Sequence, residues 1–234
     1  MRCLFGDNAS KVIFGLVCVV SLFSSNVTQI VAAAPSMEGW EALSSQQNVS
    51  VFRRQISNSD IIAVRGITTL PFPVEEVYAV LSDSGRSHEW MPLATKKETV
   101  RQIDSKSRIE YTLLNMPWPL ADRYTVARGE LDIQPGRVYA ISYVSVDGEH
   151  LEPGRIRVEL EMSSFYFRPA QDNHTYIDIA LLSDPMGAIP KFLVNSFQQN
   201  WPVQFLVGLK NQINKVRAEL PNVSSPRDAE KMVH

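Results

Sequence analysis

The change of hydrophobic period near residue 184 constrains the fold of this chain more than any other feature. Between residues 96 and 182, apolar and polar side chains alternate in strand-length pieces such as residues 108–114. Turn signals such as Gln134-Pro135-Gly136 separate these pieces. Over residues 189–216 the apolar side chains instead recur every three or four residues. The pattern predicts an antiparallel sheet with one buried face, followed by one long amphipathic helix.

The residues before this region predict smaller elements of both kinds. Residues 37–46 have the apolar spacing of a short helix, whereas residues 48–54 and 60–70 are typical of strands. Residues 74–81 again have helical spacing, with a proline and two glutamates at the start, where both suit a helix N-terminus. No internal repeat or second domain is visible. The chain is therefore predicted to be a single α+β domain.

The C-terminal helical stripe carries a proline and several large aromatic side chains. Pro202 removes one backbone donor and disfavours helical geometry at Trp201, so we expect a kink or a break there. An aromatic stripe at helical spacing is most often core. A long helix against a curved sheet can also close over a cavity, and the same side chains would then line it. The aromatic residues concerned are Phe192, Phe197, Trp201 and Phe205.

The N-terminus resembles a secretory signal peptide. Arg2 and Lys11 precede an apolar run at residues 12–23, which is shorter than the roughly 20 residues that a membrane-spanning helix needs. Small residues follow, and we predict cleavage after Ala33, with an uncleaved anchor helix as the alternative. The predicted product is exported, periplasmic or secreted, with a domain at residues 34–220 and a flexible tail at residues 221–234.

Composition and motifs exclude several classes of function. The formal net charge is −2 and no basic stripe is present, so no nucleic-acid partner is expected. Both cysteines, Cys3 and Cys18, lie in the predicted leader, and the mature chain would have no disulfide. There is no CxxC, HExxH, GxSxG or phosphate-binding glycine loop, and the four histidines lack metal-ligand spacing. We therefore predict no cofactor, no metal and no catalytic residue, although scattered strands could still assemble an acid-base site.

The strand that follows residue 122 has two unequal faces. One face carries Thr125, Ala127 and Gly129, whereas the other carries charged residues such as Arg128. The charged face is expected to point to solvent, which turns the small residues inward. Small inward residues leave space instead of filling the core, so this strand predicts a cavity.

Arg123 has the same parity as the small residues and is therefore expected to point inward. A buried guanidinium needs an anion or hydrogen-bond acceptors. Two kinds of partner remain open from the sequence. One is a carboxylate of the fold, such as Glu110 or Asp178, and the other is the headgroup of a ligand.

Three segments resemble the START (steroidogenic acute regulatory protein-related lipid transfer) domains. They are Pro117-Trp118-Pro119-Leu120-Ala121-Asp122-Arg123, Glu89-Trp90-Met91-Pro92 and Ile189-Pro190-Lys191-Phe192-Leu193-Val194-Asn195, in matching order and spacing across residues 37–218. The resemblance implies a helix-grip fold, in which a curved antiparallel sheet wraps around a long C-terminal helix and leaves a lipid-sized internal cavity. One departure is Tyr124, because many members have an aspartate after the arginine of the first motif.

The resemblance implies binding, and transfer, of a hydrophobic ligand. We expect an exported START-like protein that holds a lipid or sterol in an internal tunnel and makes transient contact with membrane surfaces. The oligomeric state is left open. The alternative is a helix-grip enzyme of the cyclase or hydrolase type acting on a hydrophobic substrate. The candidate ligand-binding residues are Arg123, Tyr111, Trp118, Tyr143, Phe192, Phe197, Trp201 and Phe205.

Overall fold

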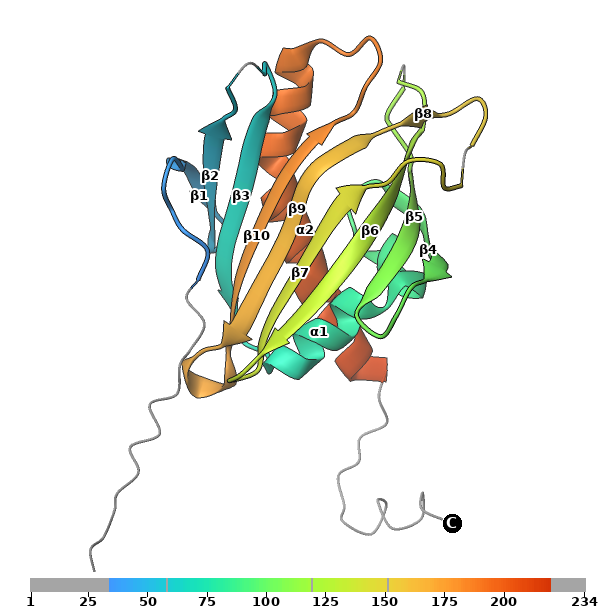
Figure 1. Cartoon of the computed structure of the whole chain (residues 1–234). Coiled ribbons are helices and arrows are strands. Elements are labelled where there is room, and N and C mark those ends of the chain that lie inside the picture. The colour runs from blue at the N-terminus through green and yellow to red at the C-terminus, as the bar shows by residue number, and fades with distance from the viewer. Residues whose placement is uncertain (1–33, 58, 119, 151, 220–234) are drawn as a thin grey trace, which may run out of the picture.

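The computed structural model describes residues 34–219 apart from residues 58, 119 and 151 (Figure 1). The predicted signal peptide at residues 1–33 and the predicted tail at residues 221–234 lie outside the described residues. The described part has two layers, a strongly curved sheet and helices that lie along one of its faces. No helix in this part is long and apolar enough to cross a membrane.

The alternation of apolar and polar residues predicted an antiparallel sheet, and the structure contains one. Together with the helices it forms the predicted α+β fold. Its strands are hydrogen-bonded in the order β1-β2-β3-β10-β9-β7-β6-β5-β4, and every neighbouring pair on this path is antiparallel. The short strand β8 leaves the path and pairs in parallel with the start of β6. In chain order the strands are β1 (Glu41–Gln46), β2 (Val49–Gln55), β3 (Ile62–Leu70), β4 (Ala94–Gln102), β5 (Ser107–Leu114), β6 (Arg123–Gln134), β7 (Val138–Ser145), β8 (Ile156–Arg157), β9 (Glu159–Pro169) and β10 (Thr175–Asp184).

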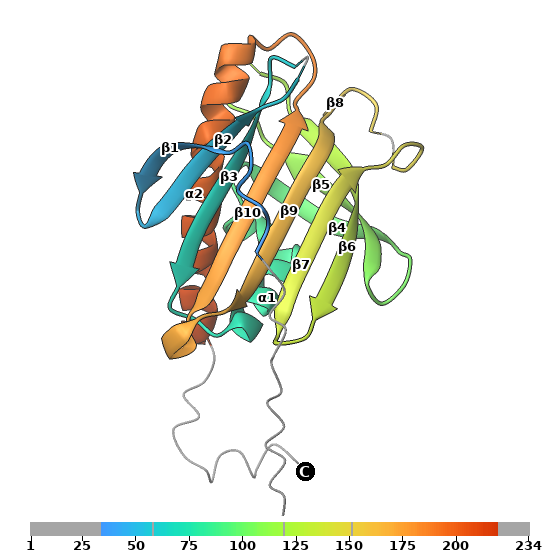
Figure 2. The same cartoon turned by 60° about the vertical axis from the view of Figure 1, so that its left-hand side comes forward.

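Two α-helices cover the inner face of the sheet. Helix α1 (Val74–Ser82) starts after Pro73 and carries Glu75 and Glu76 in its first turn, where carboxylates oppose the helix dipole favourably. The 3₁₀ helix η1 (Ser84–Glu89) follows directly, and a second one, η2 (Gln171–Asn173), joins β9 to β10. Helix α2 (Lys191–Glu219) is the long C-terminal helix. Figures 1 and 2 show α1 and α2 on the same side of the sheet, with most of the core between them and the strands.

Helix α2 runs without a break through Pro202, so of the kink or break expected at Trp201 the break is wrong. Packing explains the continuity, because Trp201, Pro202 and Phe205 are all buried against the sheet. Gly66 of β3 makes the close approach possible, since a Cβ atom added there would lie 2.6 Å from the Cβ of Pro202. The burial of these side chains outweighs the loss of one backbone hydrogen bond.

The helix predicted for residues 37–46 is also wrong, because residues 41–46 form strand β1. Gln47 and Asn48 adopt positive φ angles and turn the chain back into β2, with which β1 pairs. Trp40 lies before the strand and stacks on the guanidinium of Arg54, 4.7 Å from its ring centre. The hairpin and this stacking contact override the weak local preference for a helix.

The outer face of the sheet carries a buried ion pair beneath the first described residues. Arg65 of β3 donates its Nε hydrogen to Asp178 of β10 over 2.7 Å, and both side chains are 2% exposed. The same guanidinium donates to the backbone carbonyls of Pro35 and Ser36 at 2.9 and 2.6 Å. The pair therefore fastens the N-terminal segment across the face opposite α2.

Candidate functional site

A cavity of about 140 Å³ lies between the inner face of the sheet, the η1 turn and α2. Thr125 and Ala127 of β6 line it, as the small inward face of this strand predicted. Many of the residues in its wall are apolar or aromatic. They are Leu81, Trp90, Met91, Leu114, Leu160, Phe165, Leu181, Phe197, Trp201 and Phe205.

Aromatic rings close the cavity on the side of α2. The ring centre of Phe205 lies 4.9 Å from that of Trp201, 5.0 Å from that of Trp90 and 5.3 Å from that of Phe165. These residues come from α2, from the end of η1 and from β9. The helix is thus joined to both the sheet and the η1 turn by one aromatic cluster. An apolar ligand in the cavity would contact this cluster directly.

The opposite part of the wall carries a buried charge cluster. Lys97 of β4 places its Nζ atom 3.0 Å from Oε2 of Glu110 on β5, and Arg108 places Nε 3.0 Å from Oε1. The side chain of Glu110 is 2% exposed, that of Lys97 11% and that of Arg108 28%. Lys97 and Glu110 both line the cavity, which therefore has an ionic end.

The neighbours of these groups keep them charged. Burial by itself raises the pKa of Glu110, but the cations Lys97 and Arg108 outweigh this effect and lower it overall. Burial by itself lowers the pKa of Lys97, but this pKa is raised overall, and the charge of the Glu110 carboxylate contributes to the increase. The cluster is therefore ionic at neutral pH. Burial raises the pKa of the Tyr143 phenol, which stays protonated.

Tyr143 of β7 divides the cavity from a smaller one of about 60 Å³. Its ring lies over Gly129 of β6, where an added Cβ atom would be only 2.5 Å from the ring. Tyr143 lines both cavities, and Arg108 lines the smaller one. The ammonium of Lys97 lies 5.1 Å from the centre of the Tyr143 ring on the side of the larger cavity. Gly129 thus provides the space that lets Tyr143 form this partition.

The structure brings four of the eight sequence-predicted site residues to the cavity wall. Tyr143 comes from β7, and the other three come from α2: Phe197, Trp201 and Phe205. The other four are not among the described residues that line the cavity: Arg123, Tyr111, Trp118 and Phe192. Ligand contact stays a prediction for all eight.

Three of the four residues away from the cavity are Tyr111, Trp118 and Phe192, of which only Tyr111 is buried. Tyr111 is buried on the outer face of β5, where its ring packs 5.9 Å from that of Tyr124. Trp118 is 93% exposed and Phe192 is 71% exposed. Neither Trp118 nor Phe192 lines the cavity.

Arg123, the fourth, is buried and serves as a link between two loops. Its Nε hydrogen is donated to the carbonyl of Pro185 over 3.0 Å, and Nη1 donates to the carbonyl of Ala121. The carboxylates considered as its partners pair elsewhere, Glu110 with Lys97 and Asp178 with Arg65. Burial lowers the pKa of Arg123. The guanidinium ties the start of β6 to the loop between β10 and α2.

A family model of the START domain matches residues 26–219. The chain belongs to the START domain family. An uncharacterized protein of Pseudomonas aeruginosa is 26% identical over 188 residues, which cover 79% of this chain and 92% of that protein. The family resemblance noted in the sequence is thereby confirmed.

Solved structures share the fold of this START domain. A STAR-related lipid transfer protein fragment from Xanthomonas axonopodis matches with a TM-score of 0.68 and 21% identity, covering 76% of this chain and 99% of that one. Human StAR-related lipid transfer protein 5 matches with a TM-score of 0.72 and 18% identity, covering 78% and 89%. The helix-grip architecture, with a curved sheet and a long C-terminal helix, is therefore confirmed.

Sequence reasoning missed the ionic end of this START domain's cavity. Lys97 lies in the run Lys96-Lys97-Glu98, where nothing distinguishes the one inward-facing lysine from its solvent-facing neighbours. Glu110 was considered only as a partner for Arg123. Alternation along β4 and β5 separates the two faces of each strand, but it does not show which face turns toward the cavity. The sequence therefore does not place Lys97 and Glu110 in the cavity wall. Among the described residues, no group of three or more His, Cys, Asp or Glu is placed to hold a metal ion.

Proposed function

We propose that this START domain binds a lipid or sterol-like ligand in the cavity behind α2 and carries it between membranes after export of the protein. The observation that carries the proposal is a cavity with aromatic walls and one ionic end, closed by the long C-terminal helix. Transfer of apolar ligand surface from water contributes about 25 cal/mol per Å². The ionic end would orient the polar group of the ligand.

Ligand entry requires the wall to move. The cavity of about 140 Å³ is smaller than the roughly 300–1,000 Å³ of pockets that enclose drug-sized ligands. The two ends of α2 are held unequally. At its C-terminal end, Glu89 accepts hydrogen bonds from Lys215 at 2.6 Å and Gln212 at 3.0 Å, and Arg217 pairs with Glu76 at 2.6 Å.

The N-terminal end of α2 is more exposed. Residues 191–193 are all exposed, and the apolar ones among them face solvent. Contacts of this end include the amide of Asn195, which bonds the backbone of residues 60 and 62. We therefore place the gate at the N-terminal half of α2 and the preceding loop, with the charged C-terminal contacts as the fixed end.

Filling the cavity tests the function. Ala127→Met adds a flexible side chain that points into the cavity, so stoichiometric ligand binding is expected to fall at least tenfold. Arg128→Met places the same side chain on the exposed outer face of β6 and is expected to leave binding unchanged. Native mass spectrometry of protein purified without detergent, followed by titration with lipids and sterols, measures both. Retention of full binding by Ala127→Met would move the binding site away from this cavity.

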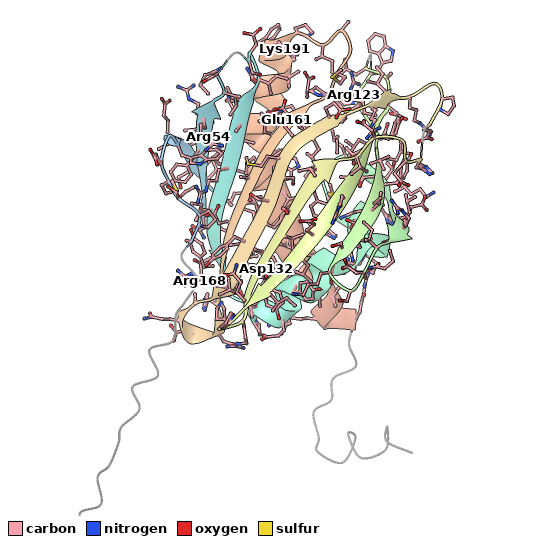
Figure 3. The ribbon with its side chains drawn as sticks, viewed as in Figure 1. Arg54, Arg123, Asp132, Glu161, Arg168 and Lys191 are labelled. Carbon is pink, nitrogen blue, oxygen red and sulfur yellow. The ribbon has the colours of Figure 1, made fainter. Side chains whose placement is uncertain are left out.

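Exposed apolar side chains beside the gate suggest where a membrane would dock. Trp118, Met186, Phe192 and Leu193, here called the rim patch, are 93%, 44%, 71% and 47% exposed. Arg123 joins the loops that carry Trp118 and Met186, and Leu120 packs into the same small apolar cluster as Ile189, which lies just before α2. Figure 3 shows Arg123 and Lys191 at the same end of the molecule. Apolar and aromatic side chains of this kind insert into the interface of a bilayer.

Phe192→Ser is expected to weaken binding to phospholipid vesicles by about tenfold, because burial of one Phe side chain contributes about 1.5–3 kcal/mol. Ile133→Ser is the control. Ile133 is 50% exposed and follows Asp132, which Figure 3 shows at the opposite end of the molecule. Co-sedimentation with vesicles measures both variants. Equal loss of vesicle binding in the two variants would contradict docking through the rim patch.

A further inference from the structure

The charge cluster at the ionic end of the cavity is unbalanced. Lys97 and Arg108 are both paired with the single carboxylate of Glu110, one on each oxygen. The hydroxyl of Ser84 also donates to Oε1 of that carboxylate. Two cations therefore share one anion, and the cluster has a formal charge of +1. Coulomb attraction that each cation gains from Glu110 is offset by repulsion between the two cations.

The unbalanced charge is least solvated at Lys97. Arg108 reaches the neighbouring small cavity and is 28% exposed, so water screens part of its charge. Lys97 is 11% exposed and its ammonium lines the larger cavity. An ammonium has three hydrogens to donate, and in the described fold that of Lys97 lies close to one carboxylate oxygen and to the ring of Tyr143. A buried cation in this position is stabilised by a further acceptor.

The rest of the cavity wall includes a buried donor that has no partner in the described structure. Glu110 is the one carboxylate among the described residues that line the cavity. Its Oε1 accepts from Ser84 and faces Arg108, and its Oε2 lies 3.0 Å from Lys97 without a hydrogen bond. The indole Nε1 hydrogen of Trp90 is buried with no hydrogen-bond partner in the described structure, and Trp90 lines the same cavity. A ligand group that accepts hydrogen bonds and carries negative charge matches both the unpartnered indole donor and the excess positive charge of the cluster. Carboxylate and phosphate oxygens have both properties.

The dimensions of the closed cavity favour a slender ligand. A dry cavity of about 150 Å³ holds one benzene molecule, and this cavity has about 140 Å³. A single acyl chain has the smallest cross-section of the common lipids. It would displace the aromatic cluster of α2 less than a fused-ring sterol or two acyl chains.

We propose that the cavity selects a single-chain amphiphile with an anionic headgroup, and that Lys97 binds this headgroup. The inference rests on the proposed function, because it names the class of ligand for the same cavity. The headgroup chemistry is a carboxylate, as in a free fatty acid, or a phosphate, as in a lysophosphatidic acid. In either case the anion brings the charge of the cluster to zero or below, and Arg108 stays paired with Glu110.

Isothermal titration calorimetry with ligands of one chain length tests the headgroup. Dodecanoate, dodecanol and the lauroyl lysophosphatidic acid are titrated below their micelle concentrations, with cholesterol in cyclodextrin as a fourth ligand. One of the two anionic ligands is expected to bind at least tenfold more tightly than dodecanol. Which of them does so distinguishes a fatty acid from a phosphate headgroup.

Variants of three residues assign the effect to Lys97. Lys97→Met is expected to reduce the preference for the anionic ligand over dodecanol from at least tenfold to less than threefold. Lys96→Met is the matched control, because Lys96 is on the outer face of β4, 54% exposed and paired with Glu98 at 2.9 Å. Glu110→Gln removes the anion that competes with the ligand for Lys97. It is therefore expected to tighten binding of the anionic ligand, whereas Lys97→Met weakens it. A structural role alone predicts that Lys97→Met and Glu110→Gln both weaken every ligand.

The outcomes separate this inference from the proposed function. Binding of dodecanol or cholesterol as tight as that of the anionic ligands would overturn the anionic headgroup and leave lipid binding intact. Binding of none of the four ligands would overturn both proposals. The role of Lys97 would be overturned if Lys97→Met and Glu110→Gln both lost affinity for every ligand. This holds where the melting temperatures of both variants stay within a few degrees of that of the unmodified protein.

Discussion

Replacement of Asp178 by Asn is expected to lower the free energy of unfolding by about 3–5 kcal/mol, because it breaks a buried ion pair on one side only. The guanidinium of Arg65 would remain 2% exposed with no carboxylate opposite it. Its remaining acceptors, the carbonyls of Pro35 and Ser36, carry only partial charges. Denaturant unfolding followed by tryptophan fluorescence measures the effect, and Trp40, which lies 5.5 Å from the Arg65 guanidinium, reports on this region.

Two control variants show that burial causes the effect. Glu75→Gln removes an ion pair with Arg137 of similar length, 2.9 Å, but with side chains 62% and 50% exposed. Its expected cost is below about 1 kcal/mol. Replacing both buried partners, as Arg65→Met with Asp178→Leu, is expected to recover most of the loss, because no charge is then left unpaired. A loss below 1 kcal/mol for Asp178→Asn would show that the N-terminal segment does not seal this face.

The sequence predicted the elements whose signals are local. Alternation located the strands within a few residues, and the proline and two glutamates before Val77 located the start of α1. The small side chains of β6 predicted an internal space, and Thr125 and Ala127 do line it. These signals succeed because strand parity and helix capping depend on neighbours in the chain.

The sequence did not predict contacts between distant segments. Arg123 was correctly expected to be buried, yet its acceptors are backbone carbonyls of its own segment and of the loop near residue 185. Glu110 pairs with Lys97 and Arg108, and these pairings depend on the register of β4 against β5 and on which face of the pair is covered. Local helical spacing in residues 37–46 was likewise overridden by a hairpin. Such contacts are fixed by tertiary packing, which single-residue patterns do not encode.

Gly208→Ala is expected to destabilise the protein by about 1–3 kcal/mol, although Ala in place of Gly normally stabilises a helix interior by about 1 kcal/mol. A Cβ atom at this position of α2 would lie 2.4 Å from the carbonyl oxygen of Trp90, whereas ordinary contacts begin at 3.4 Å. The obstacle is backbone and cannot rotate away. Thermal or chemical unfolding is therefore expected to show a loss of stability, opposite in sign to the gain that helix propensity alone predicts. Asn211→Ala, at an exposed position of the same helix, is the control and is expected to leave stability unchanged or to raise it by about 0.5 kcal/mol.

The same substitution tests how α2 closes the cavity. Trp90 lines the cavity and packs edge-on against Phe205 of α2, so a helix displaced from Trp90 opens this aromatic contact. Dissociation of a bound lipid, measured by stopped-flow fluorescence, is then expected to be faster in Gly208→Ala than in the unmodified protein, and unchanged in Asn211→Ala. If Gly208→Ala lowers stability but leaves dissociation unchanged, displacement of α2 from Trp90 does not limit release of the ligand. The gate at the N-terminal half of α2 would then open without loosening the contact between η1 and α2.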